Sequence, residues 1–358
     1  MWTRSVGILL LVGTFCLGTA VADERASSLL SKGREAYKRR NFSEAEQYDR
    51  QAMDIAERSG DAAHFAEALG DLGGIFLAKG QYDESKRLCL QALGILRSTP
   101  SKRYLPVVLN NLSVLASRDG DYAQSERYLK ESLRTAQEFD AADPYIARVL
   151  NNLGVLYYTT QDTGNAEKAF KKGIAFVEKE SGRDAVELAP LLTNLGGVYV
   201  VRKKWDDAAA LFDRAQRLLQ NSVASNHPYV AGVLDNVGTM YYAREDFAEA
   251  EKIFRKVHAI RLEVFGAEHP NVARTAFNLA LTLTASGRYE EAERLYAEAL
   301  QIYEKTEGPR APEVASTLKE MADLFRKTNR AEEAGAMEAR AESIHFELGH
   351  VVRAELLH

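Results

Sequence analysis

Apolar and polar positions recur along this chain at a fixed spacing. Between residues 227 and 305, one pattern of small, apolar and charged residues is written twice, and the second copy begins 42 positions after the first. The copies open with His-Pro, continue through a segment with apolar positions at helical spacing, and end with an aromatic residue followed by an Ala-Glu-rich helix start. Recurrence at a fixed period is the sequence signature of a repeat protein.

Two kinds of small residue extend this register over the chain. The first lies inside the first predicted helix of each copy: Gly33, Gly73, Ser113, Gly154, Gly196, Gly238, Ala280 and Ala322. The second lies early in the second predicted helix: Ala45, Ser85, Ser125, Ala166, Ala208, Ala250, Ala292 and Ala334. The two positions are 12 residues apart in all eight copies, which predicts eight helix pairs.

An aromatic residue precedes the second small residue by three positions in six copies: Phe42, Tyr82, Tyr122, Trp205, Phe247 and Tyr289. The chain here resembles the tetratricopeptide repeat family, and its 42-residue period with His-Pro and Asn-Leu-Gly resembles the kinesin light chain variety. The resemblance covers about residues 26–346. It implies an all-α fold, a right-handed superhelical α-solenoid of about eight helix-turn-helix repeats, and it is specific for packing more than for function.

The second helices carry a packing side chain four residues after their small residue. In the inner copies this residue is apolar or aromatic: Cys89, Leu129, Phe170, Phe212, Phe254 and Tyr296. A glycine in a helix interior costs about 1 kcal/mol against alanine, so the repeated first-helix glycine implies a close helix crossing. The first and last copies depart from the pattern, as expected for repeats with one face in water.

The ends of the chain define its organisation. Arg4, an apolar run over residues 6–17 and small residues at Ala20 and Ala22 are typical of a secretory signal cut before Asp23. We therefore expect a signal segment at 1–22, one solenoid domain at 23–346 and a tail at 347–358, with export to the periplasm or medium. The alternative is an uncleaved membrane anchor, because residues 5–22 carry no charge and about 17 residues can span a bilayer.

Composition and charge exclude few classes of function. The net charge is −5, and acidic and basic residues alternate along the predicted helices without a basic stripe. This pattern disfavours a nucleic-acid partner. Cys89 is the one cysteine left after cleavage, so an intramolecular disulfide is not expected.

Catalytic and metal-binding signatures are missing from the sequence. The glycine-rich segment at 70–74 falls inside a predicted first helix and not after a strand, which favours packing over nucleotide binding. The segment at 119–121 has too few ligands for a calcium loop, and His345 and His350 are poorly spaced for one helix face. We predict no enzyme activity, no cofactor, no metal and no small-molecule substrate.

One polar feature recurs two residues before the first small residue: Asn111, Asn152, Asn194, Asn236 and Asn278. Repeat 2 has Asp71 at this position and repeat 8 has Glu320. The family resemblance places the position on the concave face, where a ladder of amides could bond the main chain of an extended peptide. Bonding between neighbouring helices is the alternative, and the sequence leaves both open.

Further candidate binding residues flank this asparagine ladder in the predicted groove: Asn151, Arg148, Tyr158 and Tyr242. The lysine and arginine pairs by which chaperone-docking members of the family clamp a carboxylate are not matched. The sequence therefore favours a non-catalytic scaffold that binds an extended peptide or protein segment, of unknown identity. The alternative is a structural subunit or assembly factor of a cell-envelope complex with an empty groove. A membrane contact is expected only if residues 1–22 are retained.

Overall fold

Helices make up all the regular structure in the described part of the chain. The computed structural model describes residues 23–100, 102–220 and 228–355, and these ranges contain no strand. The predicted signal segment lies outside them.

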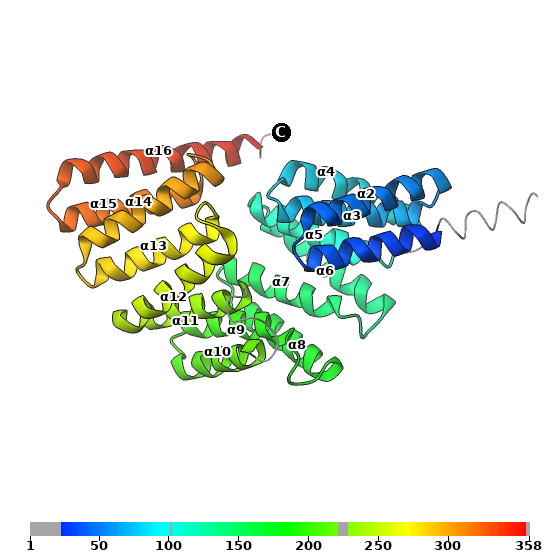
Figure 1. Cartoon of the computed structure of the whole chain (residues 1–358), viewed down its shortest axis with the longest axis horizontal. Helices are drawn as coiled ribbons and strands as arrows, with labels where there is room; N and C mark the ends of the chain where they lie inside the picture. The colour runs from blue at the N-terminus through cyan, green and yellow to red at the C-terminus, as the bar shows by residue number, and fades with distance from the viewer. Residues whose placement is uncertain (1–22, 101, 221–227, 356–358) are drawn as a thin grey trace, which may run out of the picture. The chain divides into compact units, whose positions relative to one another are not determined.

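Each repeat pairs a first helix with a second helix (Figure 1). The first helices are residues 23–38, α3 (Ala62–Ala78), α5 (Leu105–Arg118), α7 (Tyr145–Thr159), α9 (Leu188–Val201), α11 (Pro228–Ala243), α13 (Pro270–Ala285) and α15 (Pro312–Lys327). The second helices are α2 (Phe42–Ser59), α4 (Tyr82–Ser98), α6 (Tyr122–Phe139), α8 (Thr163–Glu180), α10 (Trp205–Gln220), α12 (Phe247–Phe265), α14 (Tyr289–Thr306) and α16 (Ala331–Glu355). The predicted all-α architecture of consecutive helix pairs is confirmed.

The pairs group into two compact units, one ending at Glu180 and the other beginning at Ser181. Within the first unit, α3 contacts α5 and α5 contacts α7, so consecutive first helices share one face. Within the second unit, the same holds for α9, α11, α13 and α15. The sequence pattern predicted one continuous domain, because stacked repeats extend an array without a boundary. The repeat period does not mark the division after Glu180.

The repeated glycines lie where the two helices of a pair cross. A methyl group added to Gly154 would lie 2.4 Å from the Phe170 ring, and one added to Gly196 would lie 2.4 Å from the Phe212 ring. Real Cβ atoms do not approach other atoms so closely, since packed interiors leave no such overlap. The predicted close crossing and the predicted packing position of the second helix are both confirmed.

The turn inside each helix pair has one residue in the left-handed region, two positions before the second helix begins. These residues are Arg40, Gly80, Gly120, Gln161, Lys203, Glu245, Gly287 and Asn329, with φ between 58° and 80°. Glycine adopts this conformation without steric cost, whereas the other residue types are held there by the structure around them. The aromatic position of the repeat follows as the first residue of the second helix in six pairs.

The last helix is longer than the sequence pattern indicated. α16 continues to Glu355, whereas we expected the repeat array to end at residue 346. Among the helices of the described residues, none combines the length and the apolar content needed to cross a bilayer.

Candidate functional site

In the first unit, the predicted asparagine ladder ties neighbouring first helices together. Asn111 Nδ2 on α5 donates to the main-chain oxygen of Gly70 on α3 at 3.3 Å. Asn152 Nδ2 on α7 donates to Asn110 Oδ1 on α5 at 2.7 Å, and Asn110 is buried. Both amides thus make the helix-to-helix bonds that the sequence left as the alternative.

In the second unit, the ladder asparagines Asn194, Asn236 and Asn278 are half-buried. Asn236 Nδ2 donates to the main-chain oxygen of Gly232 within its own helix at 3.0 Å. Its Oδ1 lies beside Gly197 on α9, 3.4 Å from where a side chain on that glycine would begin. Asn194 and Asn236 also line a cavity of about 190 Å³ between α9 and α11, so these two amides remain beside open space.

The other predicted groove residues divide between exposed and packed positions. Tyr158 is 41% exposed, and Arg148 is exposed with its guanidinium 5.2 Å from the centre of the Tyr145 ring. Asn151 donates weakly to Asn152 Oδ1 at 3.4 Å. Tyr242 packs its ring 5.6 Å from that of Phe247 and is half-buried.

Apolar side chains are exposed on the first helices of the first unit. Val114 on α5 and Val155 on α7 occupy the same repeat position and are 39% and 41% exposed. Tyr158 lies about one helical turn after Val155 and is exposed to the same degree. Because α5 and α7 are in contact, these side chains form a row on one face of the unit.

A network of charged side chains that the sequence did not predict lies near this row. Arg34 Nε, on the helix of residues 23–38, donates to Asp71 Oδ2 on α3 at 3.0 Å, and its Nη2 donates to Glu67. The Tyr104 hydroxyl, just before α5, donates to the other oxygen of Asp71, and Arg34 lies 5.1 Å from the Tyr104 ring centre. The ladder position of repeat 2 is therefore held in an ionic network.

Asp49 on α2 adds a buried carboxylate with an unsatisfied oxygen. It is 1% exposed, and its Oδ1 has no hydrogen-bond partner among the described residues. Gly33 makes this possible, because a methyl group there would overlap Asp49 Oδ1. Burial, together with the charge of Asp71, raises the pKa of Asp49 to about 8, although Arg34 opposes the shift. Burial also raises the pKa of Asp71 to about 6 against the opposing charge of Arg34.

These side chains surround a cavity of about 250 Å³ within the first unit. Asp49 and the first helices of four repeats contribute to it, among them Tyr37, Tyr104 and Tyr145. Burial raises the pKa of the Tyr145 hydroxyl, and the charge of Arg148 opposes the shift. We call this space the N-terminal cavity.

A second buried ion pair, in the second unit, has a structural role. Arg261 on α12 is 3% exposed and donates to Asp235 on α11 at 3.1 Å and to the main-chain oxygen of Asn271 at the start of α13 at 3.3 Å. It also donates to Thr275. Arg261 thus joins three consecutive helices, as buried charges do when they are paired and hydrogen-bonded.

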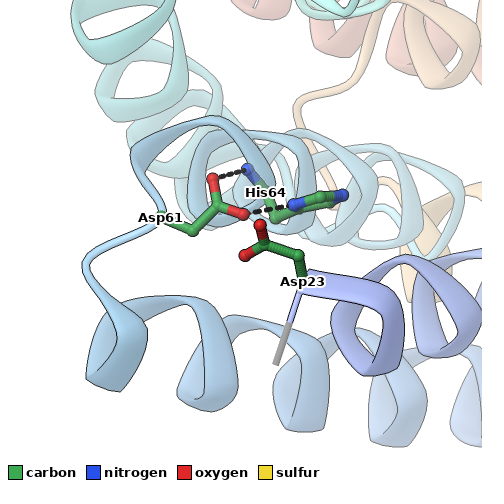
Figure 2. A group of neighbouring side chains, drawn as sticks. All are labelled: Asp23, Asp61 and His64. Carbon is green, nitrogen blue, oxygen red and sulfur yellow. Dashed lines mark hydrogen bonds and ion pairs between the residues drawn. The ribbon is translucent and has the colours of Figure 1, made fainter. Parts of the chain in front are cut away.

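Asp23, Asp61 and His64 form the one group of potential metal ligands in the described residues, and Figure 2 shows how they converge. Asp61 is the N-cap of α3: its Oδ1 accepts from the main-chain nitrogens of Ala63 and His64, at 3.0 and 3.1 Å. Its Oδ2 is bonded to the His64 ring. Burial acts to raise the pKa of Asp61, but the bonds to His64 outweigh it and hold the pKa below its usual value. Asp61 Oδ1 is thus used in capping, which satisfies orphan donors of the helix, and its Oδ2 is held by the His64 ring.

Cys89 is a packing residue. It is buried against Gly73 at the helix crossing, and burial raises the pKa of its thiol to about 12. A thiol that stays protonated at neutral pH is a poor nucleophile.

Comparison with solved structures shows where this fold recurs. A Rap protein in complex with Competence and Sporulation Factor has a TM-score of 0.65 at 12% identity, covering 91% of this chain and 99% of its own. The apo form of the quorum sensor NprR from B. thuringiensis has a TM-score of 0.63 at 15% identity, covering 89% of this chain and 87% of its own. A putative kinesin light chain with nearly identical TPR-like repeats from Podosopora anserina has a TM-score of 0.47 at 20% identity, covering 57% of this chain and 97% of its own.

Family models give the sequence-level relation. No curated protein matches the chain. A tetratricopeptide repeat model matches residues 64–138, 104–179, 187–263, 229–305 and 274–345, and a second tetratricopeptide repeat model matches residues 25–59. Because these matches together span most of the chain, the protein belongs to the tetratricopeptide repeat family.

Proposed function

We propose that this protein is a non-catalytic interaction scaffold that binds an extended peptide or protein segment on the face formed by its first helices. The observation that carries the proposal is the row of exposed apolar side chains, Val114, Val155 and Tyr158, on the first helices of one unit. A grouped apolar surface rimmed by polar residues is typical of an interaction site. The tetratricopeptide fold is in general an interaction scaffold, and its use here fits the family.

The structural neighbours support a partner of this kind. The structure of the Rap protein is a complex with Competence and Sporulation Factor. Its fold matches 91% of the present chain. At 12% sequence identity, the likeness extends to the fold and does not specify which segment this protein binds.

The asparagine ladder contributes differently in the two units under this proposal. Asn111 and Asn152 hold first helices together and so shape the binding face. Asn194 and Asn236 line the cavity between α9 and α11. A side-chain amide has donors and acceptors on one plane, so these two can bond the main chain of a bound segment.

We also propose that the scaffold works outside the cytoplasm, in the periplasm or medium. The support is the sequence before Asp23, with its basic start, apolar run and small residues at Ala20 and Ala22.

A pair of matched variants tests the binding face. Val155 on the first helix α7 and Phe139 on the second helix α6 are both exposed apolar residues of the same unit, at 41% and 50%. Short peptides selected on the wild-type protein from a random array are measured by fluorescence anisotropy. Val155→Glu should weaken their binding by about ten-fold or more, because a charge desolvated in an apolar contact costs more than about 1.4 kcal/mol. Phe139→Glu should leave binding unchanged.

The same variants address the alternative role in an envelope assembly. If native protein purifies in a stable multi-protein particle that Phe139→Glu disrupts while Val155→Glu does not, the second-helix face carries the function. That result, together with no peptide selected from the array, would contradict the proposed groove binding.

A further inference from the structure

The N-terminal cavity is large enough for one chemical group of a bound segment. Its volume is about 250 Å³, below the roughly 300–1,000 Å³ of sites that hold drug-sized ligands. A water molecule occupies about 30 Å³ in the liquid, so the cavity exceeds what a single buried water fills. Its size fits a long side chain or a small amine.

Asp49 departs from the repeat pattern in the first repeat and is buried, whereas Glu338, which departs at the same position of the last repeat, is partly exposed and paired with Arg326. At the equivalent position, the next six repeats carry Cys89, Leu129, Phe170, Phe212, Phe254 and Tyr296. Asp49 is as buried as these residues, and its Oδ1 lacks a donor among the described residues. An unpaired buried carboxylate is unfavourable for folding, whereas an apolar residue here would pack at no such cost. Asp49 lines the cavity, so a donor that enters the cavity can bond its carboxylate.

The charges around the cavity leave an excess of acceptors. Arg34 is already bonded to Glu67 and Asp71, and the Tyr104 hydroxyl is bonded to Asp71. Asp49 interacts electrostatically with Arg34, Glu67 and Asp71. Among the described residues, no group donates a hydrogen bond to its Oδ1.

Two other cations line the cavity and are exposed. Lys38 donates to Glu35 at 2.7 Å, and Arg148 lies 5.2 Å from the centre of the Tyr145 ring. Both are exposed side chains, and neither bonds the buried Asp49 Oδ1.

The cavity walls suit a cation. Tyr37, Tyr104 and Tyr145 contribute to them. Aromatic faces attract ammonium and guanidinium groups through the ring quadrupole. The network already contains one such arrangement, in which Arg34 lies 5.1 Å from the Tyr104 ring centre.

We propose that the N-terminal cavity receives a cationic nitrogen group, a guanidinium or an ammonium, with the Asp49 carboxylate as its acceptor and the tyrosine rings as its walls. The group belongs to a basic side chain of the segment bound under the proposed function, on which this inference rests. The raised pKa of Asp49 fits this role, because a carboxyl group without a counter-charge holds its proton and an entering cation restores its charge.

Peptide arrays that differ at one fixed position test this chemistry. Three arrays carry arginine, citrulline or glutamate at that position among random neighbours, and citrulline keeps the shape of arginine without its charge. The wild-type protein should select arginine peptides and bind them about ten-fold or more tightly than their citrulline versions, as expected for a charge-assisted bond. Asp49→Asn should remove this preference.

A matched control separates the cavity from overall charge. Glu338 occupies the repeat position of Asp49 in the last repeat, where it pairs with Arg326, and Glu338→Gln makes the matching replacement of a carboxyl group by an amide. This variant should keep the arginine preference. Circular dichroism on both variants checks folding, and Asp49→Asn is expected to fold because an amide has nearly the size and shape of the protonated carboxyl group.

The outcomes distinguish this inference from the proposed function. Equal binding of arginine and citrulline peptides, or selection of glutamate peptides, would overturn the cation site while groove binding stands. If no peptide binds but agmatine or cadaverine binds in calorimetry and Asp49→Asn abolishes it, the cation site stands with a free amine as ligand, and the proposed function fails. Binding of neither peptides nor amines would overturn both.

Discussion

At the scale of single residues, Asp49 shows what the repeat pattern can and cannot reveal. Aligning the eight copies by their small residues shows Asp49 and, in the last repeat, Glu338 as the two carboxylates in a column that is otherwise apolar, so the sequence contains the signal. The partners of that signal cannot be read in the same way. Arg34, Asp71 and Tyr104 come from three repeats, and only the crossing of their helices brings them together.

The charge state of Asp49 makes a prediction about stability and pH. Its pKa is raised to about 8 by burial and by Asp71, against the charge of Arg34. Between about pH 4 and about pH 8 the unfolded chain has lost this proton and the folded chain keeps it, so its contribution to stability falls as pH rises. Asp49→Asn should remove this loss and gain on the wild type by at most about 1.4 kcal/mol per pH unit in that window.

Urea unfolding at a series of pH values measures the difference between the two proteins. Taking the difference matters because other carboxylates, such as Glu46 and Glu251, have lowered pKa values and act in the opposite direction. Glu338→Gln provides the comparison at the same repeat position. Wild-type and Asp49→Asn curves that stay parallel from pH 4 to pH 8 would refute the assigned charge state.

At the scale of helices, the pattern predicts boundaries better than turns. In six repeats the second helix begins at the recurring aromatic residue. This boundary was predictable because the aromatic residue belongs to the repeated packing pattern. The left-handed turn residue two positions earlier is glycine in only three of eight repeats and Arg40, Gln161, Lys203, Glu245 or Asn329 in the others. Helix packing imposes this conformation on residues whose own preference does not predict it.

The asparagine ladder shows the same limit. Its recurrence was visible in the sequence, and so were its two possible roles. The partner of Asn152 is Asn110, one repeat earlier, and that of Asn111 is the main chain of Gly70. Which role an amide takes depends on differences of less than an ångström in the separation of neighbouring helices. The spacing of residues along the chain does not determine such differences.

Two glycines in the first unit make opposite predictions at this scale. A Cβ at Gly154 would lie 2.4 Å from Phe170, whereas a Cβ at Gly94 in α4 would meet no atom within 4 Å. Gly94→Ala should raise the free energy of unfolding by about 0.5–1 kcal/mol, because alanine loses less backbone entropy in a helix. Gly154→Ala should lower it by about 1–3 kcal/mol through overpacking. Urea unfolding of both variants measures the pair, and a change of the same sign in each would show that the helix crossing is assigned wrongly.

At the scale of the whole molecule, the repeat register extends through both units while the division between them is silent in the sequence. The small residues Gly154 and Gly196 on either side of it are 42 positions apart, the same spacing as in the later repeats. The period records the spacing of packing positions within each repeat, so it does not mark where one compact unit ends and the next begins. The division after Glu180 therefore required coordinates.

The segment before Asp23 determines where the mature chain begins. Ala20 and Ala22 are the small residues that a signal peptidase accepts, so we expect the exported protein to begin at Asp23. The buried residues of the first helix begin at Ala26 and include Leu30, so cleavage there removes none of the described core. Intact mass of protein from the periplasm or medium should match a chain starting at Asp23, with the same melting temperature as protein expressed from that residue. Ala22→Phe should block cleavage and retain the longer chain in the membrane fraction. A native product of full length that requires detergent would instead establish the segment before Asp23 as an anchor.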